Sequence, residues 1–182
     1  MKNNESYLDG RVQVVVGDIT QQDVIAIVNA ANSSLMGGAG VDGAIHRNGG
    51  PQILKECQEI RNTLHPDGLP TGEAVLTSGG NLPAKYVIHT VGPIYGNDPE
   101  REAELLAACY RNSLLLAYQH HITSIAFPSI STGAYGYPKR EAAQIASKTI
   151  KQFLATDQET EEVRLVFFQQ NDASVFLDNH EF

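Results

Sequence analysis

Apolar positions along the chain fall into short, mostly β-branched runs separated by segments with helical spacing. Such runs predict strands, because β-branched and aromatic side chains suit the pleated surface of a sheet. The runs lie at Arg11–Gly17, Val24–Ala30, Ala74–Ser78, Tyr86–Val91, Ser124–Phe127 and Val163–Phe168. Val24–Ala30 is nearly all apolar, which indicates a buried central strand.

Helical periodicity fills the intervals between these runs. It is clearest in Lys139–Leu154, whose apolar stripe consists of Ala142, Ala146, Ile150 and Phe153 or Leu154. Further helices are expected up to about Arg61, over Glu100–His120, and in a short segment after Asp172. Strands that alternate with helices predict an α/β fold, with a mostly parallel or mixed sheet covered on both faces. Ligands of such sheets bind at the carboxyl ends of the strands.

Length and composition are those of one compact domain, so we expect residues 1–182 to form a single domain with a core at about residues 11–176. The net charge is −8 and the pI about 5.1, with few and scattered Lys and Arg residues. This argues against duplex DNA or RNA as a partner. It does not argue against a nucleotide, because backbone N–H groups can also bind phosphate.

The remaining composition points to a protein without metal or membrane anchor. Cys57 and Cys109 are expected to be buried free thiols, since a metal site needs more ligands at close spacing. No segment approaches the roughly 20 apolar residues of a membrane span. Met1–Gly10 is polar and lacks an apolar signal-peptide stretch, so we expect a cytoplasmic protein and, in addition, a monomer.

Gly37–Gly43 holds four glycines in seven residues, and its last six residues match the dinucleotide-binding pattern G-x-G-x-x-G. In that fold the first glycine directly follows a strand, whereas here Ala31–Met36 intervene. The acidic residue expected about 20 positions later is also missing, because Cys57–Ile60 continues a helix. A P-loop is excluded since no Gly-Lys-Ser/Thr follows. A nicotinamide cofactor is therefore disfavoured.

A second loop of the same kind, Ser129–Gly136, also follows a strand and precedes a helix. Either loop alone could be a flexible surface segment. Two such loops at one sheet edge would form a cleft with N–H groups on both walls, and a diphosphate fits that chemistry better than a single phosphate does.

Several polar residues would lie at the same edge. Asp18 ends the first strand, where it could cap a turn or accept a hydrogen bond from an amine such as that of adenine. Asn29 and Asn32 end the second, where they could bond the backbone or orient sugar hydroxyls. Asp42 and His46 are four residues apart and share a helix face. The helix N-terminus favours an ionised Asp42, which could simply complement the helix dipole, while His46 is interpreted as a packed side chain.

These residues together resemble the macrodomain family, and within it the MacroD-type subgroup. The matching stretches, which keep the family's order, are Gly17–Thr20, Ile27–Leu35, Gly37–His46, Thr71–Ala74, Leu82–Pro93 and Ala126–Pro138. One departure is Ala39, where the subgroup commonly has glycine; alanine would matter if that position needed a positive φ. The other is the C-terminus, which is expected to lack part of a closing helix.

The resemblance implies a three-layer α/β/α sandwich with a mixed central sheet, and it implies a site for ADP-ribose. Adenine would lie beside Asp18 and Ile19, with Phe168 as a stacking face. The diphosphate would lie between the two loops, against Gly40, Val41, Ser131, Thr132, Gly133, Ala134 and Tyr135. The distal ribose would meet Asn32, Asp42 and Tyr135.

MacroD-type members resemble hydrolases that remove mono-ADP-ribose from acidic side chains of proteins and deacetylate O-acetyl-ADP-ribose. The family's catalytic asparagine and aspartate are matched by Asn32 and Asp42. In the implied mechanism Asp42 or a substrate phosphate activates a water while Asn32 holds the ribose, with no cofactor. Two alternatives stay open, a reader module that binds ADP-ribose without turnover and a binder of single-stranded RNA or poly(ADP-ribose). The acidic pI disfavours the second alternative.

Overall fold

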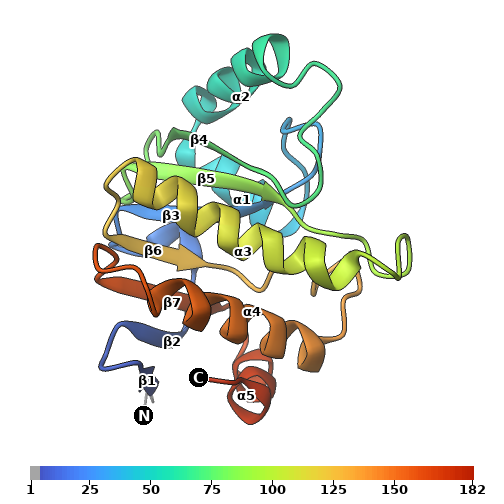
Figure 1. Ribbon diagram of the computed structural model, residues 1–182. Helices are drawn as coiled ribbons and strands as arrows, with labels where there is room; N and C mark the ends of the chain where they lie inside the picture. The colour runs from blue at the N-terminus through green and yellow to red at the C-terminus, as the bar shows by residue number, and fades with distance from the viewer. Residues whose placement is uncertain (1–4) are drawn as a thin grey trace.

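The computed structural model describes residues 5–182 and has a seven-stranded sheet at its centre (Figure 1). Residues 1–4 lie outside the described part. They belong to the polar segment Met1–Gly10, from which no signal peptide was expected. The strands are β1 (Glu5–Tyr7), β2 (Val12–Val16), β3 (Ala26–Ala31), β4 (Ala74–Ser78), β5 (Tyr86–Val91), β6 (Ser124–Phe127) and β7 (Glu162–Phe167). The helices are the short 3-10 helix η1 (Ile19–Gln21), α1 (Gly40–Gly49), α2 (Pro51–Thr63), α3 (Glu102–Gln119), α4 (Lys139–Leu154) and α5 (Gln170–Asn179).

The sheet order is β1-β2-β7-β6-β3-β5-β4. The inner strands β2, β7, β6, β3 and β5 are parallel, while β1 and β4 are antiparallel edge strands. The mixed sheet confirms the fold class expected from the sequence. All six strands predicted from apolar runs are present, and only the three-residue β1 was missed.

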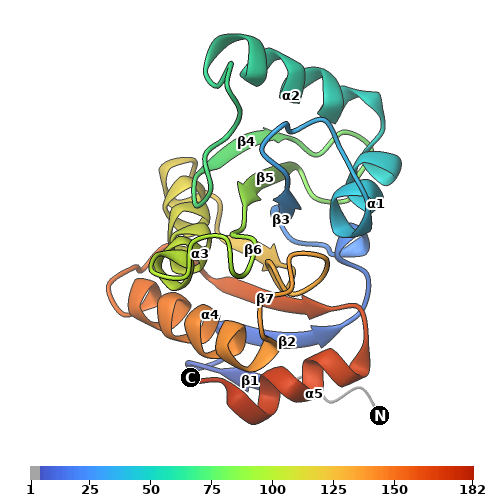
Figure 2. The same cartoon turned by 90° about the vertical axis from the view of Figure 1, so that its right-hand side faces the viewer.

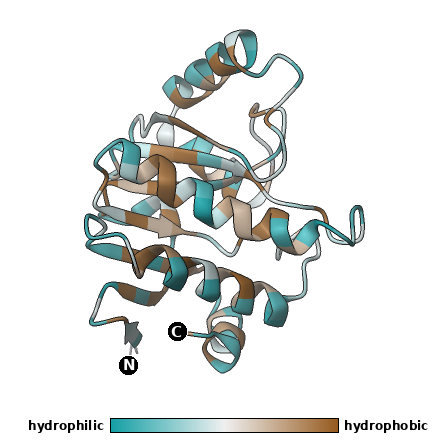
Figure 3. Ribbon diagram, in the orientation of Figure 1, coloured by the Kyte–Doolittle hydropathy of each residue, from teal (hydrophilic) through white to brown (hydrophobic). Residues whose placement is uncertain are grey.

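Helices cover both faces of the sheet and complete three layers (Figure 2). On one face α3, α4 and α5 pack over apolar residues that include Ile88, Leu106 and Ile150. On the other face η1, α1 and α2 pack over a second cluster that includes Ile27 and Ile53. Figure 3 shows the result as mainly hydrophobic strands between helices that alternate hydrophobic and hydrophilic residues. Successive strand residues point to opposite faces, so each strand serves both clusters.

The helices expected up to about Arg61 are α1 and α2. Gly50 ends α1 with a φ of +79°, a conformation that L side chains rarely adopt, and Pro51 begins α2. Proline suits this first helical position because its N–H would have no partner there. The glycine–proline pair therefore turns the chain between the helices.

The short helix expected after Asp172 is present as α5. α5 begins at Gln170, before the residue from which a helix was expected, and runs for 10 residues. Phe182 then stacks on Tyr7 at 5.4 Å, so the end of the chain packs against β1. This contact comes from the distant N-terminal strand, so the local sequence did not predict it.

Candidate functional site

The loops that follow the inner strands gather at one edge of the sheet, where these parallel strands have their carboxyl ends (Figure 2). The sheet order places them in a row. Asp18 follows β2 and Phe168 follows the neighbouring β7. The loop 128–138 follows β6, and the glycine loop that leads to α1 follows β3. Along the sheet edge, the residues expected to bind adenine therefore come first. Those expected to bind the diphosphate and the distal ribose follow in that order.

Asp18 is exposed and caps η1. One of its carboxylate oxygens, Oδ1, accepts hydrogen bonds from the Thr20 backbone N–H at 2.9 Å and from the Thr20 hydroxyl at 2.7 Å. Asp18 therefore caps η1, as one of the two interpretations expected. Both bonds use Oδ1. Phe168 has 80% of its surface exposed, directly after β7. A large aromatic side chain that is so exposed contributes little to the core.

The glycine loop is organised by Asn32. Its side-chain Nδ2 donates to the Gly37 carbonyl at 3.0 Å, and its Oδ1 accepts from the Ser34 backbone N–H at 3.1 Å. Ala39 has a φ of −97°, so the alanine at this position causes no backbone strain. Gly40 has a φ of +60° and begins α1.

The start of α1 has no side-chain cap. Among the described residues, the backbone N–H groups of Gly40, Val41 and Asp42 have no acceptor within the protein. The first N–H groups of a helix need partners and carry the positive end of its dipole. This wall of the edge can therefore bind an anion.

The loop after β6 forms the facing wall and is tightly held. The Tyr137 N–H donates to the Ser131 carbonyl at 2.9 Å, and the Tyr95 N–H donates to the Tyr135 carbonyl at 2.9 Å. Ser131 adopts a φ of +65° and lies against Gly92, where any side chain would collide with it. Within residues 5–182, the N–H groups of residues 131–135 make no hydrogen bond to protein atoms. The loop is thus an ordered row of donors, not a flexible surface segment.

Asn32 and Asp42 meet beside Gly38. A Cβ atom placed on Gly38 would lie 3.1 Å from Asp42 Oδ2 and 3.3 Å from Asn32 Nδ2. The structure therefore brings the two residues expected to be catalytic to one spot, next to the anion-binding walls. The absence of a side chain at Gly38 leaves room between them.

Asp42 is buried, with 5% of its surface exposed. Asn29 Nδ2 donates to its Oδ1 at 2.8 Å, and His46 Nε2 lies 3.4 Å from the same oxygen. Burial raises the pKa of the carboxyl group, but these two side chains outweigh it and leave the pKa below its usual value. Asp42 is therefore an ionised carboxylate at neutral pH.

Two histidines complete the surroundings of Asp42. His46 packs in the fold and shares a helix face with Asp42, as its spacing of four residues indicated. Sequence reasoning missed the other, His89. His89 is fully buried on β5 and lies next to Asn29, which is its partner in the β3–β5 register. Nothing in the local sequence marks His89, because the contact depends on strand pairing.

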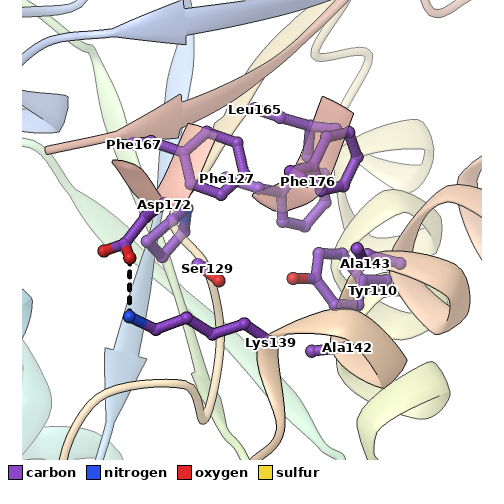
Figure 4. Close-up of a pocket in the computed structure, with 12 residues that line it drawn as sticks. Tyr110, Phe127, Ser129, Lys139, Ala142, Ala143, Leu165, Phe167, Asp172 and Phe176 are labelled. Carbon is purple, nitrogen blue, oxygen red and sulfur yellow. Dashed lines mark hydrogen bonds and ion pairs between the residues drawn. The ribbon is translucent and has the colours of Figure 1, made fainter. Parts of the chain in front are cut away.

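A small cavity lies elsewhere, between α3, α4, α5 and the ends of β6 and β7 (Figure 4). Its volume of about 10 Å³ is at the limit for one water molecule. Lys139 and Asp172 form an ion pair of 2.6 Å at its edge and join the start of α4 to α5. Neither Asn32 nor Asp42 lines this cavity, and a nucleotide could not enter it.

Within residues 5–182, no group of three or more His, Cys, Asp or Glu side chains could hold a metal ion. No helix in that range is long and apolar enough to cross a membrane. Cys57 and Cys109 are buried and free, as expected, and burial raises their pKa values to about 12 and about 11.

Comparison with known proteins gives the family. The sequence profile of the Macro domain family matches residues 28–146. The chain belongs to the macrodomain family. This macrodomain is 52% identical over 169 residues to the O-acetyl-ADP-ribose deacetylase of Salmonella newport, which covers 93% of each chain. It is 53% identical over 167 residues to a macro domain-containing protein of Cupriavidus necator, covering 92% of this chain and 95% of the relative.

Solved structures agree with the family. The macrodomain of Oceanobacillus iheyensis with MES bound superimposes with a TM-score of 0.94 at 49% identity, over 98% of this macrodomain and 96% of that chain. A variant of the same protein with ADPR superimposes with a TM-score of 0.90 at 53% identity, over 92% and 90% of the two chains. The resemblance that the motifs indicated is confirmed.

Proposed function

We propose that this macrodomain binds ADP-ribose and hydrolyses esters on its distal ribose. The observation that carries the proposal is the combination of two walls of free backbone N–H groups with the Asn32–Asp42 pair beside them. Each wall offers several donors, which suits the two phosphates of a diphosphate. An ionised carboxylate would repel a phosphate, so Asp42 fits the end of the ligand beyond it.

The sheet order supports the orientation of the ligand. Adenine would lie at the β2–β7 end, where Phe168 offers a stacking face and Asp18 an acceptor for the exocyclic amine. The diphosphate would lie against Gly40, Val41 and residues 131–135. The distal ribose would then reach Asn32, Asp42 and Tyr135. At the other end of the ligand, adenine would lie beside Ile19.

The relatives support the reaction class. A relative at 52% identity is named O-acetyl-ADP-ribose deacetylase, and the Oceanobacillus iheyensis protein has been solved with ADPR. In that protein an asparagine and an aspartate that lie ten positions apart have each been replaced by alanine. Asn32 and Asp42 have the same separation here. We extend the substrates from O-acetyl-ADP-ribose to mono-ADP-ribose on acidic side chains, because both carry an ester at the distal ribose.

The chemistry is ester hydrolysis by a positioned water. The water oxygen attacks the ester carbonyl carbon, and the bond between this carbon and the ribose oxygen breaks. One water proton ends on the ribose hydroxyl and the other stays on the released carboxylic acid. A carboxylate with a low pKa is a weak base, so Asp42 serves mainly to orient the water by accepting its hydrogen bond. Asn32 holds the ribose.

The deciding experiment compares the wild type with Asp42→Ala on O-acetyl-ADP-ribose and on a peptide with ADP-ribosyl-glutamate. We expect Asp42→Ala to lower kcat by about 10²-fold or more, the scale of a lost positioning or acid–base group. Calorimetry should show that ADP-ribose binding changes far less, because the diphosphate and adenine contacts remain. Wild-type binding without any turnover would show that this macrodomain is a reader module.

A further inference from the structure

A chain of buried polar side chains crosses three strands beneath Asp42. Thr77 on β4, His89 on β5 and Asn29 on β3 are all buried and face the layer of α1 and α2. His89 Nε2 lies 2.8 Å from the Thr77 hydroxyl, and His89 Nδ1 lies 3.1 Å from Asn29 Nδ2. Asn29 Nδ2 in turn donates to Asp42 at 2.8 Å. The chain thus links the edge strand of the sheet to the carboxylate of the site.

With Asn29 Nδ2 facing Asp42, one arrangement of hydrogen atoms satisfies these contacts. Asn29 Nδ2 carries two hydrogens, one for Asp42 and one for His89 Nδ1, so Nδ1 must be the unprotonated acceptor. The ring proton then lies on Nε2 and is donated to the Thr77 hydroxyl, whose own hydrogen goes to the Ser78 carbonyl at 3.0 Å. Burial lowers the pKa of His89 to about 3, so the ring carries a single proton.

The orientation of the Asn29 amide depends on this tautomer. In the observed orientation, Asn29 Oδ1 is buried and has no hydrogen-bond partner among the described residues. This orientation therefore leaves one buried acceptor without a donor. A reversed amide would turn Oδ1 toward the carboxylate of Asp42 and the lone pair of His89 Nδ1. If the proton were on Nδ1 instead, the reversed amide would gain a hydrogen bond from His89, and Asp42 would lose the hydrogen bond from Asn29.

We infer that His89 is a positioning residue, held by Thr77 in the Nε2–H tautomer so that the Asn29 amide donates to Asp42. It touches no substrate and acts only through Asn29. Its effect on turnover rests on the proposed function, whereas its effect on Asp42 does not. Three other titratable groups lie here. His46 on α1 is 3.4 Å from Asp42, and Cys57 on α2 is 3.9 Å from His89 and has a raised pKa that keeps it neutral. Glu56 on α2 accepts from the Ser78 backbone N–H at 3.2 Å, next to Thr77.

Two variants of Thr77 separate the hydrogen bond from packing. Thr77→Val keeps the side-chain shape but removes the hydroxyl, while Thr77→Ser keeps the hydroxyl and removes a buried methyl group. Thr90→Val is the matched control, because Thr90 is a buried threonine on β5 whose hydroxyl donates to the Glu73 carbonyl at 2.8 Å. All three are made in the full chain and compared at equal folded fraction.

Three readouts test the inference. Imidazole ¹⁵N NMR should show the Nε2–H tautomer of His89 in the wild type and in Thr77→Ser, and Nδ1–H in Thr77→Val. A ¹³C NMR titration should show a higher pKa of Asp42 in Thr77→Val alone. With O-acetyl-ADP-ribose as substrate, kcat should fall about fivefold or more in Thr77→Val at nearly constant KM, and less than twofold in Thr77→Ser and Thr90→Val.

The outcomes distinguish this inference from the proposed function. An Nδ1–H tautomer in the wild type overturns the inference, and so does an equal loss of kcat in Thr77→Val and Thr77→Ser. A wild type without turnover overturns the proposed function instead. In that case the tautomer and the pKa of Asp42 still decide whether His89 positions the carboxylate, because neither measurement needs a substrate.

Discussion

Asn29 and Asp42 join the central sheet to helix α1 by a hydrogen bond of 2.8 Å between the amide nitrogen and the buried carboxylate. A buried charge is costly unless it has partners. Asn29 supplies a partner from the rigid strand β3, so the position of Asp42 follows the sheet and not the mobility of a surface side chain. The same bond helps to keep the pKa of Asp42 below its usual value.

The gap at Gly38 gives the first prediction. A methyl group there would lie 3.1 Å from Asp42 Oδ2 and 3.3 Å from Asn32 Nδ2, tighter than ordinary contact. Gly38→Ala should therefore displace one of the two side chains and lower kcat for O-acetyl-ADP-ribose about tenfold or more, since small misplacements are costly in catalysis. Gly17→Ala is the control outside the proposed contacts, because its methyl group would lie 3.6 Å or more from the nearest atoms, an ordinary contact distance. Equal activity of both variants would contradict the proposed role of the pair.

The exposed Phe168 gives the second prediction. Replacement by alanine should leave the free energy of unfolding nearly unchanged, because 80% of this side chain is already in water. If adenine stacks on the ring, Phe168→Ala should lose about 1–3 kcal/mol of the binding free energy of ADP-ribose. Calorimetry should then show a Kd raised by roughly 5- to 150-fold. Phe168→Tyr keeps the ring face and should bind like the wild type. Unaltered affinity in Phe168→Ala would place adenine elsewhere.

Most of the fold could be predicted because its signals are local. The apolar runs and the stripe of α4 report burial directly, and five of the seven strands are parallel inner strands with such runs. The bounds of α1 and α2 were not predicted, although Gly50 and Pro51 mark the turn between these helices. β1 and the packing of Phe182 were missed because each depends on the other end of the chain.

The candidate site was predictable where its residues follow strand ends. Asn32 and Asp42 lie together at the edge that strand ends define, as their positions suggested. The chain from Thr77 through His89 to Asn29 was not predictable in this way. Its members are far apart in sequence, and only the pairing of β3, β5 and β4 brings them into contact.

The buried His89 predicts a pH dependence of stability. Its pKa is about 3 in the folded protein and ordinarily 6.5, so between these values the unfolded chain binds a proton that the folded chain does not. The free energy of unfolding should therefore fall as pH falls from about 6.5 toward about 3, by up to ~1.4 kcal/mol per unit from this group. His89→Asn, which cannot titrate, should show a smaller slope in denaturant unfolding at pH 7, 6 and 5. Parallel curves would contradict a neutral buried His89.

The start of α1 allows the anion site to be tested with a single charge. Gly40 has a φ of +60°, and a Cβ atom there would meet nothing within 4 Å. Asparagine and aspartate tolerate this backbone conformation better than other residues, and they have nearly the same shape. Gly40→Asn and Gly40→Asp therefore differ mainly by a negative charge at the proposed diphosphate position.

That charge should weaken the binding of ADP-ribose in Gly40→Asp relative to Gly40→Asn. Like charges about 5 Å apart near a protein surface repel by about 2–3 kcal/mol, which corresponds to roughly 30- to 150-fold in Kd. Calorimetry at low and high salt should show the difference shrink as salt screens the repulsion. An aspartate in the first turn of a helix favours the folded state, so unfolding of Gly40→Asp cannot account for its weaker binding. Equal affinity of the two variants at low salt would mean that the diphosphate does not lie at the start of α1.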